Sequence, residues 1–135
     1  MEYLHKDITE KIIKAFYNAY NILGFGFLEK VYENAMMIEL SSMNLIREKQ
    51  KPIDLYFKEK KVGEYFADII VENKLIIELK AAENLIPEHE TQLLNYLKAT
   101  NIEVGLLLNF GKMSQIKRQI FENVYKKSVQ IPYIS

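Results

Sequence analysis

Apolar side chains recur every three to four residues through the first part of the chain, which is the spacing of one face of an α-helix. The first such series is followed by Gly24 and Gly26, and glycine commonly ends a helix. Its members are Ile8, Ile12, Phe16, Tyr20 and Leu23. Asp7, with Glu10 three residues later, resembles a capping box, so we expect Asp7 to be the N-cap of this helix.

A second helix is predicted from about residue 28 to residue 43, again from the spacing of apolar residues. The stripe expected to face the core is Leu28, Val31, Ala35 and Ile38, widened by Tyr32, Met36 and Leu40. The pattern then changes to alternation, which is typical of β-strands. Three strands are predicted, starting with 53–57, where Pro52 suits a strand start. Runs 63–71 and 75–80 continue an antiparallel meander.

The last third of the chain predicts a helix between two buried strands. Pro87 suits the first turn of a helix that runs to about Thr100. The run 104–109 is continuously apolar, as expected of a strand covered on both faces. A strand, helix and strand in this order form a right-handed crossover, so run 104–109 should lie parallel to run 75–80. Residues 116–121 fit either a helix or an edge strand, and we favour the strand; residues 131–135 resemble a tail.

Composition sets limits on the class of protein. The chain has 135 residues, enough for one domain with a core, and we treat 1–135 as a single domain. It has no cysteine and two distant histidines, so a bound metal should have oxygen ligands, which favours Mg²⁺ or Mn²⁺. No apolar run is long enough to span a membrane and the first residues do not form a signal peptide, so a cytoplasmic location is expected. Net charge is zero, which argues mildly against a non-specific nucleic-acid coat protein.

Charged residues interrupt two of the apolar strand runs. Asp68 lies within run 63–71, and Glu78 and Lys80 end run 75–80, where alternation places both on one face. A turn of three residues would pair Val71 with Leu75, which puts Asp68 directly opposite Glu78. Opposed like charges destabilise a sheet unless a cation lies between them. Charges at strand ends also often emerge into solvent, so this spacing alone leaves both interpretations open.

The order of elements and the charged positions resemble the PD-(D/E)xK nuclease superfamily. Glu78-Leu79-Lys80 matches the second half of its motif, whereas the first half is present only as its acid, because Ala67 stands in place of the proline before Asp68. Residues 26–32 match the GxxExxY motif of a small prokaryotic family within it, and residues 92–96 match the QxxxY element of its RecB-like and lambda-exonuclease-like branch. With Asn109-Phe110-Gly111, these motifs cover about residues 8 to 121. The resemblance implies a restriction-endonuclease-like α/β fold, a mixed sheet of four to five strands flanked by helices.

The same resemblance implies roles for individual residues. Asp68, Glu78 and Glu29, together with the backbone carbonyl of Leu79, would hold Mg²⁺ or Mn²⁺. Lys80 would position the attacking water and offset charge on the phosphate, so the catalytic set is Lys80, Asp68 and Glu78. Gln92 and Tyr96 would contact the substrate. Without the family, Glu29 could be an ordinary first-turn acid, and Gln92 and Tyr96 an ordinary polar pair on a helix.

The function expected from these residues is Mg²⁺-dependent hydrolysis of phosphodiester bonds, with DNA favoured over RNA as the partner. The branch resemblance favours an exonuclease or flap-type enzyme of low sequence specificity. A different class remains open, namely a non-catalytic module that binds nucleic acid or a protein partner on the same fold. A junction resolvase is a third alternative, and it would require a homodimer.

Overall fold

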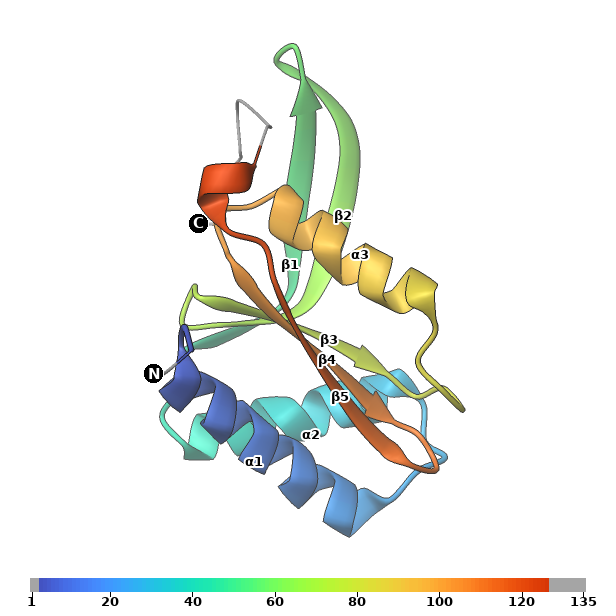
Figure 1. Cartoon of the computed structure of the whole chain (residues 1–135). Helices are drawn as coiled ribbons and strands as arrows, with labels where there is room; N and C mark the ends of the chain where they lie inside the picture. Colours follow the sequence, from blue (N-terminus) through green and yellow to red (C-terminus); the bar gives the residue numbers. More distant parts are fainter. Residues whose placement is uncertain (1–2, 127–135) are drawn as a thin grey trace.

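The computed structural model describes residues 3–126, which form a mixed five-stranded sheet flanked by three helices (Figure 1). The elements in chain order are α1 (Lys6–Leu23), α2 (Glu29–Ser42), β1 (Arg47–Phe57), β2 (Lys60–Val71), β3 (Leu75–Lys80), α3 (Pro87–Lys98), β4 (Val104–Phe110), β5 (Ser114–Ile120) and a 3₁₀ turn, η1 (Asn123–Tyr125). The strand order is β1-β2-β3-β4-β5, and only the β3–β4 pair is parallel. The expected α/β class and mixed sheet are therefore confirmed. None of the helices in the described range is both long and apolar enough to cross a membrane.

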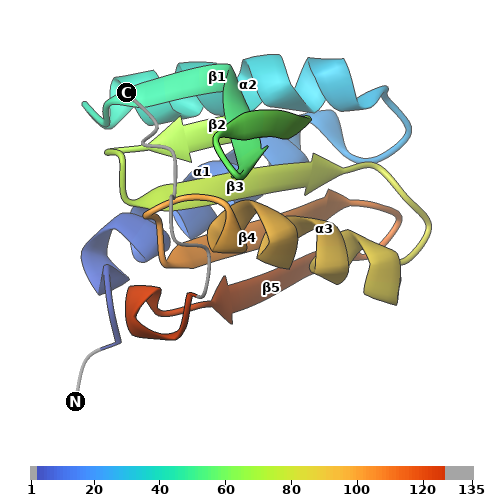
Figure 2. The same cartoon turned by 90° about the horizontal axis from the view of Figure 1, so that it is seen from above.

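The helices cover both faces of the sheet, with α1 and α2 on one face and α3 on the other (Figure 2). The larger apolar cluster joins α1 and α2 to the sheet, and a smaller one lies between α3 and the sheet. Strand β4 is buried along its whole length, because it is paired on both sides, with β3 and β5, and covered on both faces. It lies parallel to β3, as the crossover through α3 predicted. The predicted strand at 116–121 is β5, which pairs only with β4 and forms one edge of the sheet.

Three local expectations were wrong. α1 begins at Lys6, and its N-cap is His5 in the left-handed region with no side-chain capping bond, so Asp7 lies inside the first turn. β1 starts at Arg47, five residues before Pro52, which is tolerated inside it because β1 is an edge strand. α2 faces the core through a different stripe, described next.

The buried side of α2 is rotated from the predicted one. Leu28, Val31 and Ile38 are exposed, whereas Tyr32, Met36 and Leu40 are fully buried. Apolar residues lie on more than one side of α2, so their spacing did not determine which side faces the sheet. The rotation also buries an acidic residue, Glu33, beside the predicted site.

The β1–β2 hairpin extends beyond the rest of the sheet (Figure 1). Only Ile69–Val71 of β2 pair with β3, while residues 60–67 of β2 pair with β1 alone. β2 and β3 therefore diverge on the N-terminal side of Ile69, and Asp68 lies at the point of separation. This divergence of two strands creates the space in which the predicted site residues lie.

Candidate metal and phosphodiester site

The hairpin between β2 and β3 has the predicted register. Val71 pairs with Leu75 and Ile69 with Ile77, so the intervening loop has three residues and Asp68 comes opposite Glu78. The regular backbone pairing of β2 with β3 ends just before this position, and beyond it the side chains of the two acids accept the hydrogen bonds between the strands. The backbone N–H of Asp68 donates to Glu78 Oε1 at 3.0 Å, and the N–H of Leu79 donates to Asp68 Oδ2 at 2.8 Å. Each acid thus accepts a hydrogen bond from the opposite strand, which fixes both carboxylates at the separation point.

Simple strand alternation does not hold at Asp68. Ala67 belongs to the cluster under α3, whereas Ile69 belongs to the cluster under α1 and α2, although residues two apart in a regular strand share a face. β2 therefore twists at Asp68, and its carboxylate reaches across the gap toward Leu79. Glu78 is 3% exposed, and Asp68 is half-buried.

Side chains from α2 and β1 complete this side of the site. A small pocket of about 140 Å³ is lined by Glu29, Lys30, Glu33, Gln50, Asp68 and Leu79. Gln50 Nε2 donates both to Glu33 Oε2 and, at 3.3 Å, to Asp68 Oδ1, and Lys30 pairs with Glu33 at 3.0 Å. Gln50 has a φ of 52°, a strained backbone for a residue other than glycine, at the register position opposite Asp68.

Sequence reasoning missed Glu33 and Gln50. Glu33 follows Glu29 by four residues and so lies on the same side of α2, a spacing that offered a signal. Gln50 offered none, because its contact with Asp68 depends on the irregular backbone of β1. The predicted Glu29 lines the same pocket from the first residue of α2, but its side chain is exposed.

Lys80 lies against α3. Lys80 Nζ donates to Gln92 Oε1 at 3.3 Å, and Gln92 in turn shares a side-chain hydrogen bond with Tyr96. Tyr96 is 4% exposed, and its ring contacts Tyr65 of β2 at 5.4 Å between centroids. The structure thus links Lys80, Gln92 and Tyr96 in one chain of contacts. His89 has a local role, since its Nδ1 accepts from the N–H of Ile86 at the start of α3.

Burial and charge repulsion make both acids weaker acids than usual. Burial raises the pKa of Glu78 well above its ordinary value of 4.5, and the nearby charge of Asp68 adds to this rise. Burial also raises the pKa of Asp68 above 3.8, with Glu33 and Glu29 contributing repulsion. Within residues 3–126, neither carboxylate forms an ion pair. The charge of nearby Lys80 offsets only part of the rise at Glu78. The buried Glu78 and the half-buried Asp68 therefore lie side by side, and among the described residues neither has an ion-pair partner.

The GxxExxY residues position the start of α2. Tyr32 Oη donates to the carbonyl of Gly24 at 2.7 Å and accepts from the N–H of Phe27 at 3.2 Å. Its ring stacks on Phe110 at 4.2 Å and an interplanar angle of 15°. Gly26 has a φ of 109°, which L side chains rarely adopt. The loop is thus tied to the core at Tyr32, so that α2 begins with Glu29 next to the acid pair.

The segment after Lys80 is held by β4. The buried Asn109 accepts from the N–H of Ala82 at 2.9 Å and donates to the carbonyl of Ala82 at 3.0 Å. A side chain at Gly111 would place its Cβ 2.3 Å from the carbonyl oxygen of Ala82, so only glycine fits this close approach. Asn109 and Gly111 therefore fix the chain two residues beyond Lys80.

The donor set fits a hard divalent cation in type. Among residues 3–126, no three acidic, histidine or cysteine side chains form a group that could hold a metal ion, so Asp68, Glu78 and Glu29 do not assemble into a complete shell. Mg²⁺ is nevertheless commonly held by one or two carboxylates, with water and substrate phosphate as its other ligands. Asp68, Glu78 and the carbonyl of Leu79 supply oxygen donors of this kind. The full ligand set remains a prediction.

Comparison with known proteins identifies the family. The model of the PD-(D/E)XK nuclease superfamily matches residues 6–129, nearly the whole chain. The chain therefore belongs to the PD-(D/E)XK nuclease superfamily, and the sequence resemblance is confirmed at that level. A search of curated proteins and a search of solved structures each found no match.

Proposed function

We propose that the protein is a nuclease dependent on Mg²⁺ or Mn²⁺ that hydrolyses phosphodiester bonds of DNA. The observation that carries this proposal is the acid pair at the separation of β2 and β3. Glu78 is almost fully buried and the charge of Asp68 repels it, while the charge of Lys80 offsets only part of the resulting rise in its pKa. Within the described residues neither acid forms an ion pair. A pair of this kind needs compensation, which a divalent cation provides.

The residues around the pair have complementary tasks. When bound, Mg²⁺ or Mn²⁺ supplies positive charge at the phosphate and lowers the pKa of a bound water. Asp68 and Glu78 hold the cation, together with the carbonyl of Leu79. Lys80 places a further positive charge where negative charge develops on the phosphate, and it orients the attacking water. Gln92 fixes Lys80 through their hydrogen bond and contacts the substrate backbone.

Position on the fold supports the finer assignment to the GxxExxY family and the RecB-like and lambda-exonuclease-like branch. In the GxxExxY motif, Tyr32 anchors the loop before α2, and Glu29 lines the pocket beside the acid pair. In the QxxxY motif, Gln92 lies next to Lys80 and accepts its hydrogen bond. This branch favours exonuclease or flap-type cleavage.

Two observations favour a second candidate, a binding module that keeps the nuclease fold without catalysis. The described residues do not assemble three ligating side chains, and Ala67 replaces the motif proline. Such a module would bind nucleic acid without cutting it. A junction resolvase would additionally be a homodimer, with two sites on one DNA.

The deciding experiment measures cleavage by the full chain. With Mn²⁺, the protein should degrade single-stranded or linear DNA, and EDTA should stop it. Lys80→Ala should lose cleavage while retaining cation binding, because Lys80 acts on the phosphate and water, whereas Glu78→Ala should lose both. Gln92→Ala should mainly weaken substrate binding, and Lys14→Ala, at an exposed position on α1, should behave like wild type.

Binding of DNA and cation without cleavage of linear, flap or four-way-junction substrates would instead support the binding module. Cleavage that survives in Glu78→Ala would place the chemistry elsewhere on the molecule.

A further inference from the structure

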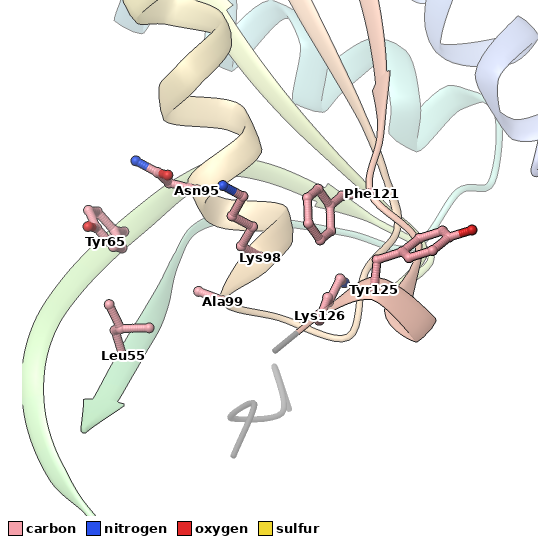
Figure 3. A pocket seen from close by; sticks show the side chains of 8 residues that line it. All are labelled: Leu55, Tyr65, Asn95, Lys98, Ala99, Phe121, Tyr125 and Lys126. Carbon is pink, nitrogen blue, oxygen red and sulfur yellow. The ribbon is translucent and has the colours of Figure 1, made fainter. Parts of the chain in front are cut away.

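A second concave region lies beside the predicted site, between the β1–β2 hairpin and the C-terminal half of α3. We call it the α3–hairpin pocket, and its volume is about 550 Å³. Figure 3 shows Leu55 and Tyr65 on the hairpin side, and Phe121 and Lys126 on the opposite side. Asn95 and Lys98 of α3 lie between these two sides. The volume falls within the usual range of small-molecule and cofactor pockets.

The lining of the α3–hairpin pocket combines aromatic rings with positive charge. Tyr65 and Phe121 present aromatic rings from two different elements, and Lys98 Nζ lies over the Phe121 ring at 5.5 Å from its centroid. Lys126 donates to the carbonyls of Thr100 and Ile102, each at 2.8 Å. Among the described lining residues there are two lysines and no acid. This composition suits a planar, apolar group attached to a negatively charged chain.

A continuous chain of contacts joins this pocket to the site. Tyr65, in the pocket wall, contacts the ring of Tyr96, whose hydroxyl shares a hydrogen bond with Gln92, and Gln92 accepts from Lys80. From Gln92 to Lys98 the helix advances about 9 Å, at 1.5 Å per residue. A strand whose phosphate lies at Lys80 can therefore place a neighbouring nucleotide at the α3–hairpin pocket.

We infer that the α3–hairpin pocket holds one unpaired nucleobase of the substrate strand, next to the phosphate that is cleaved. The inference rests on the proposed function and specifies its substrate, a single strand or a frayed end. The base stacks on the ring of Phe121, the amide of Asn95 faces its edge, and Lys98 pairs with the adjoining phosphate. A base inside a duplex cannot enter the pocket without unpairing, so blunt duplex should be the poorer substrate.

An abasic scan tests this inference. The ligands are a fluorescein-labelled oligothymidylate and a set of the same strands, each of which lacks one base at a different position. Each strand is titrated with Lys80→Ala protein in the presence of Mn²⁺, because this substitution is expected to block cleavage but not binding. Loss of the base at one position should weaken binding by about 5- to 100-fold, the equivalent of one base–aromatic stack. A parallel set of oligouridylates tests whether the same pocket serves RNA.

Pocket variants then assign the effect to this place. Phe121→Leu keeps apolar volume but removes the ring face, so the intact strand should bind about fivefold or more weakly and the abasic position should lose its effect. Phe57→Leu is the matched control, because Phe57 is an exposed ring on the hairpin outside the pocket. It should bind like the parent protein at every position of the scan.

A flat abasic scan from a protein that cleaves DNA would overturn the inference and leave the proposed function intact. The α3–hairpin pocket would then have another occupant. A protein that neither binds nor cleaves any strand would overturn both. Equal loss in Phe121→Leu and Phe57→Leu would also contradict the assignment to this pocket.

Discussion

Asn109 offers a sharp test of how β4 holds the segment that follows Lys80. Its side chain is fully buried and forms three hydrogen bonds, two with the backbone of Ala82 and one with Gln115 Oε1 at 3.0 Å. Asn109→Leu keeps the same number and branching of side-chain heavy atoms but can form none of these bonds. Gln115 keeps its bond from the N–H of Leu85, so the groups left without a partner are the N–H and carbonyl of Ala82.

The expected loss follows from those two groups. An unpaired buried backbone group costs about 1–3 kcal/mol, and because Ala82 is half-buried, water can partly replace the lost bonds. We therefore expect Asn109→Leu to lower the free energy of unfolding by about 2 kcal/mol. For a domain of this size the melting temperature should fall by roughly 6–10 °C. Lys80 would also lose its fixed position, so cleavage should fall further than the folded fraction explains.

Two further variants separate this explanation from a general effect of substitution. Asn109→Asp keeps one acceptor but turns a carboxylate oxygen toward the carbonyl of Ala82, so its stability should recover at acid pH, where the carboxyl is protonated and can donate. Asn18→Leu, on α1, removes a single hydrogen bond to Glu39 of α2 and should cost less than about 1 kcal/mol. Thermal unfolding followed by circular dichroism measures all three. An Asn109→Leu protein that melts within roughly 2 °C of wild type would refute the reasoning.

Two predictions concern the acid pair itself. In cation-free protein both acids have raised pKa values in the folded state, so the free energy of unfolding should fall as pH rises above their ordinary pKa values of 3.8 and 4.5. Glu78→Gln should flatten this pH dependence and raise the melting temperature at neutral pH. An unchanged slope in a series of melting curves at different pH values would contradict this prediction. Mg²⁺ or Mn²⁺ at a hundredfold excess over its dissociation constant should stabilise wild type by about 2.7 kcal/mol. Asp68→Asn should abolish that response in the same assay, whereas an equal response in both proteins would place the ion elsewhere.

The regular part of the fold could be predicted because local rules determine it. The β2–β3 register follows from a three-residue turn, which pairs residues 69–71 of β2 with residues 75–77 of β3. The parallel placement of β4 follows from its continuous apolar run and from the handedness of crossovers. The family motifs lie on neighbouring elements, with Lys80 on β3 and Gln92 and Tyr96 on α3, and a hydrogen bond joins Lys80 to Gln92. The roles of these residues stay predictions.

The irregular part of the site could not be predicted, because tertiary packing decides it. Glu33 is buried beside Asp68 only because α2 packs against the sheet through Tyr32, Met36 and Leu40. Since α2 also has apolar residues on its other sides, the sequence did not show which side would be buried. Gln50 reaches Asp68 from a backbone with positive φ, which nothing in the residues around it indicates. The break in alternation between Ala67 and Ile69 is likewise a response to the separation of β2 from β3.

The place of the acid pair explains how the fold tolerates it. Where β2 leaves β3, the N–H groups of Asp68 and Leu79 lose strand partners, and the carboxylates of Glu78 and Asp68 supply the missing acceptors. Those bonds favour the charged acids, but burial and mutual repulsion outweigh them, because the pKa of each acid is still raised. The native structure therefore retains an unfavourable electrostatic term at this one point. Under the proposed function a bound cation offsets this repulsion. The repulsion between Asp68 and Glu78 therefore both lowers the stability of the cation-free protein and favours binding of the cation. A substitution that relieves the repulsion should accordingly stabilise the cation-free protein and weaken cation binding together.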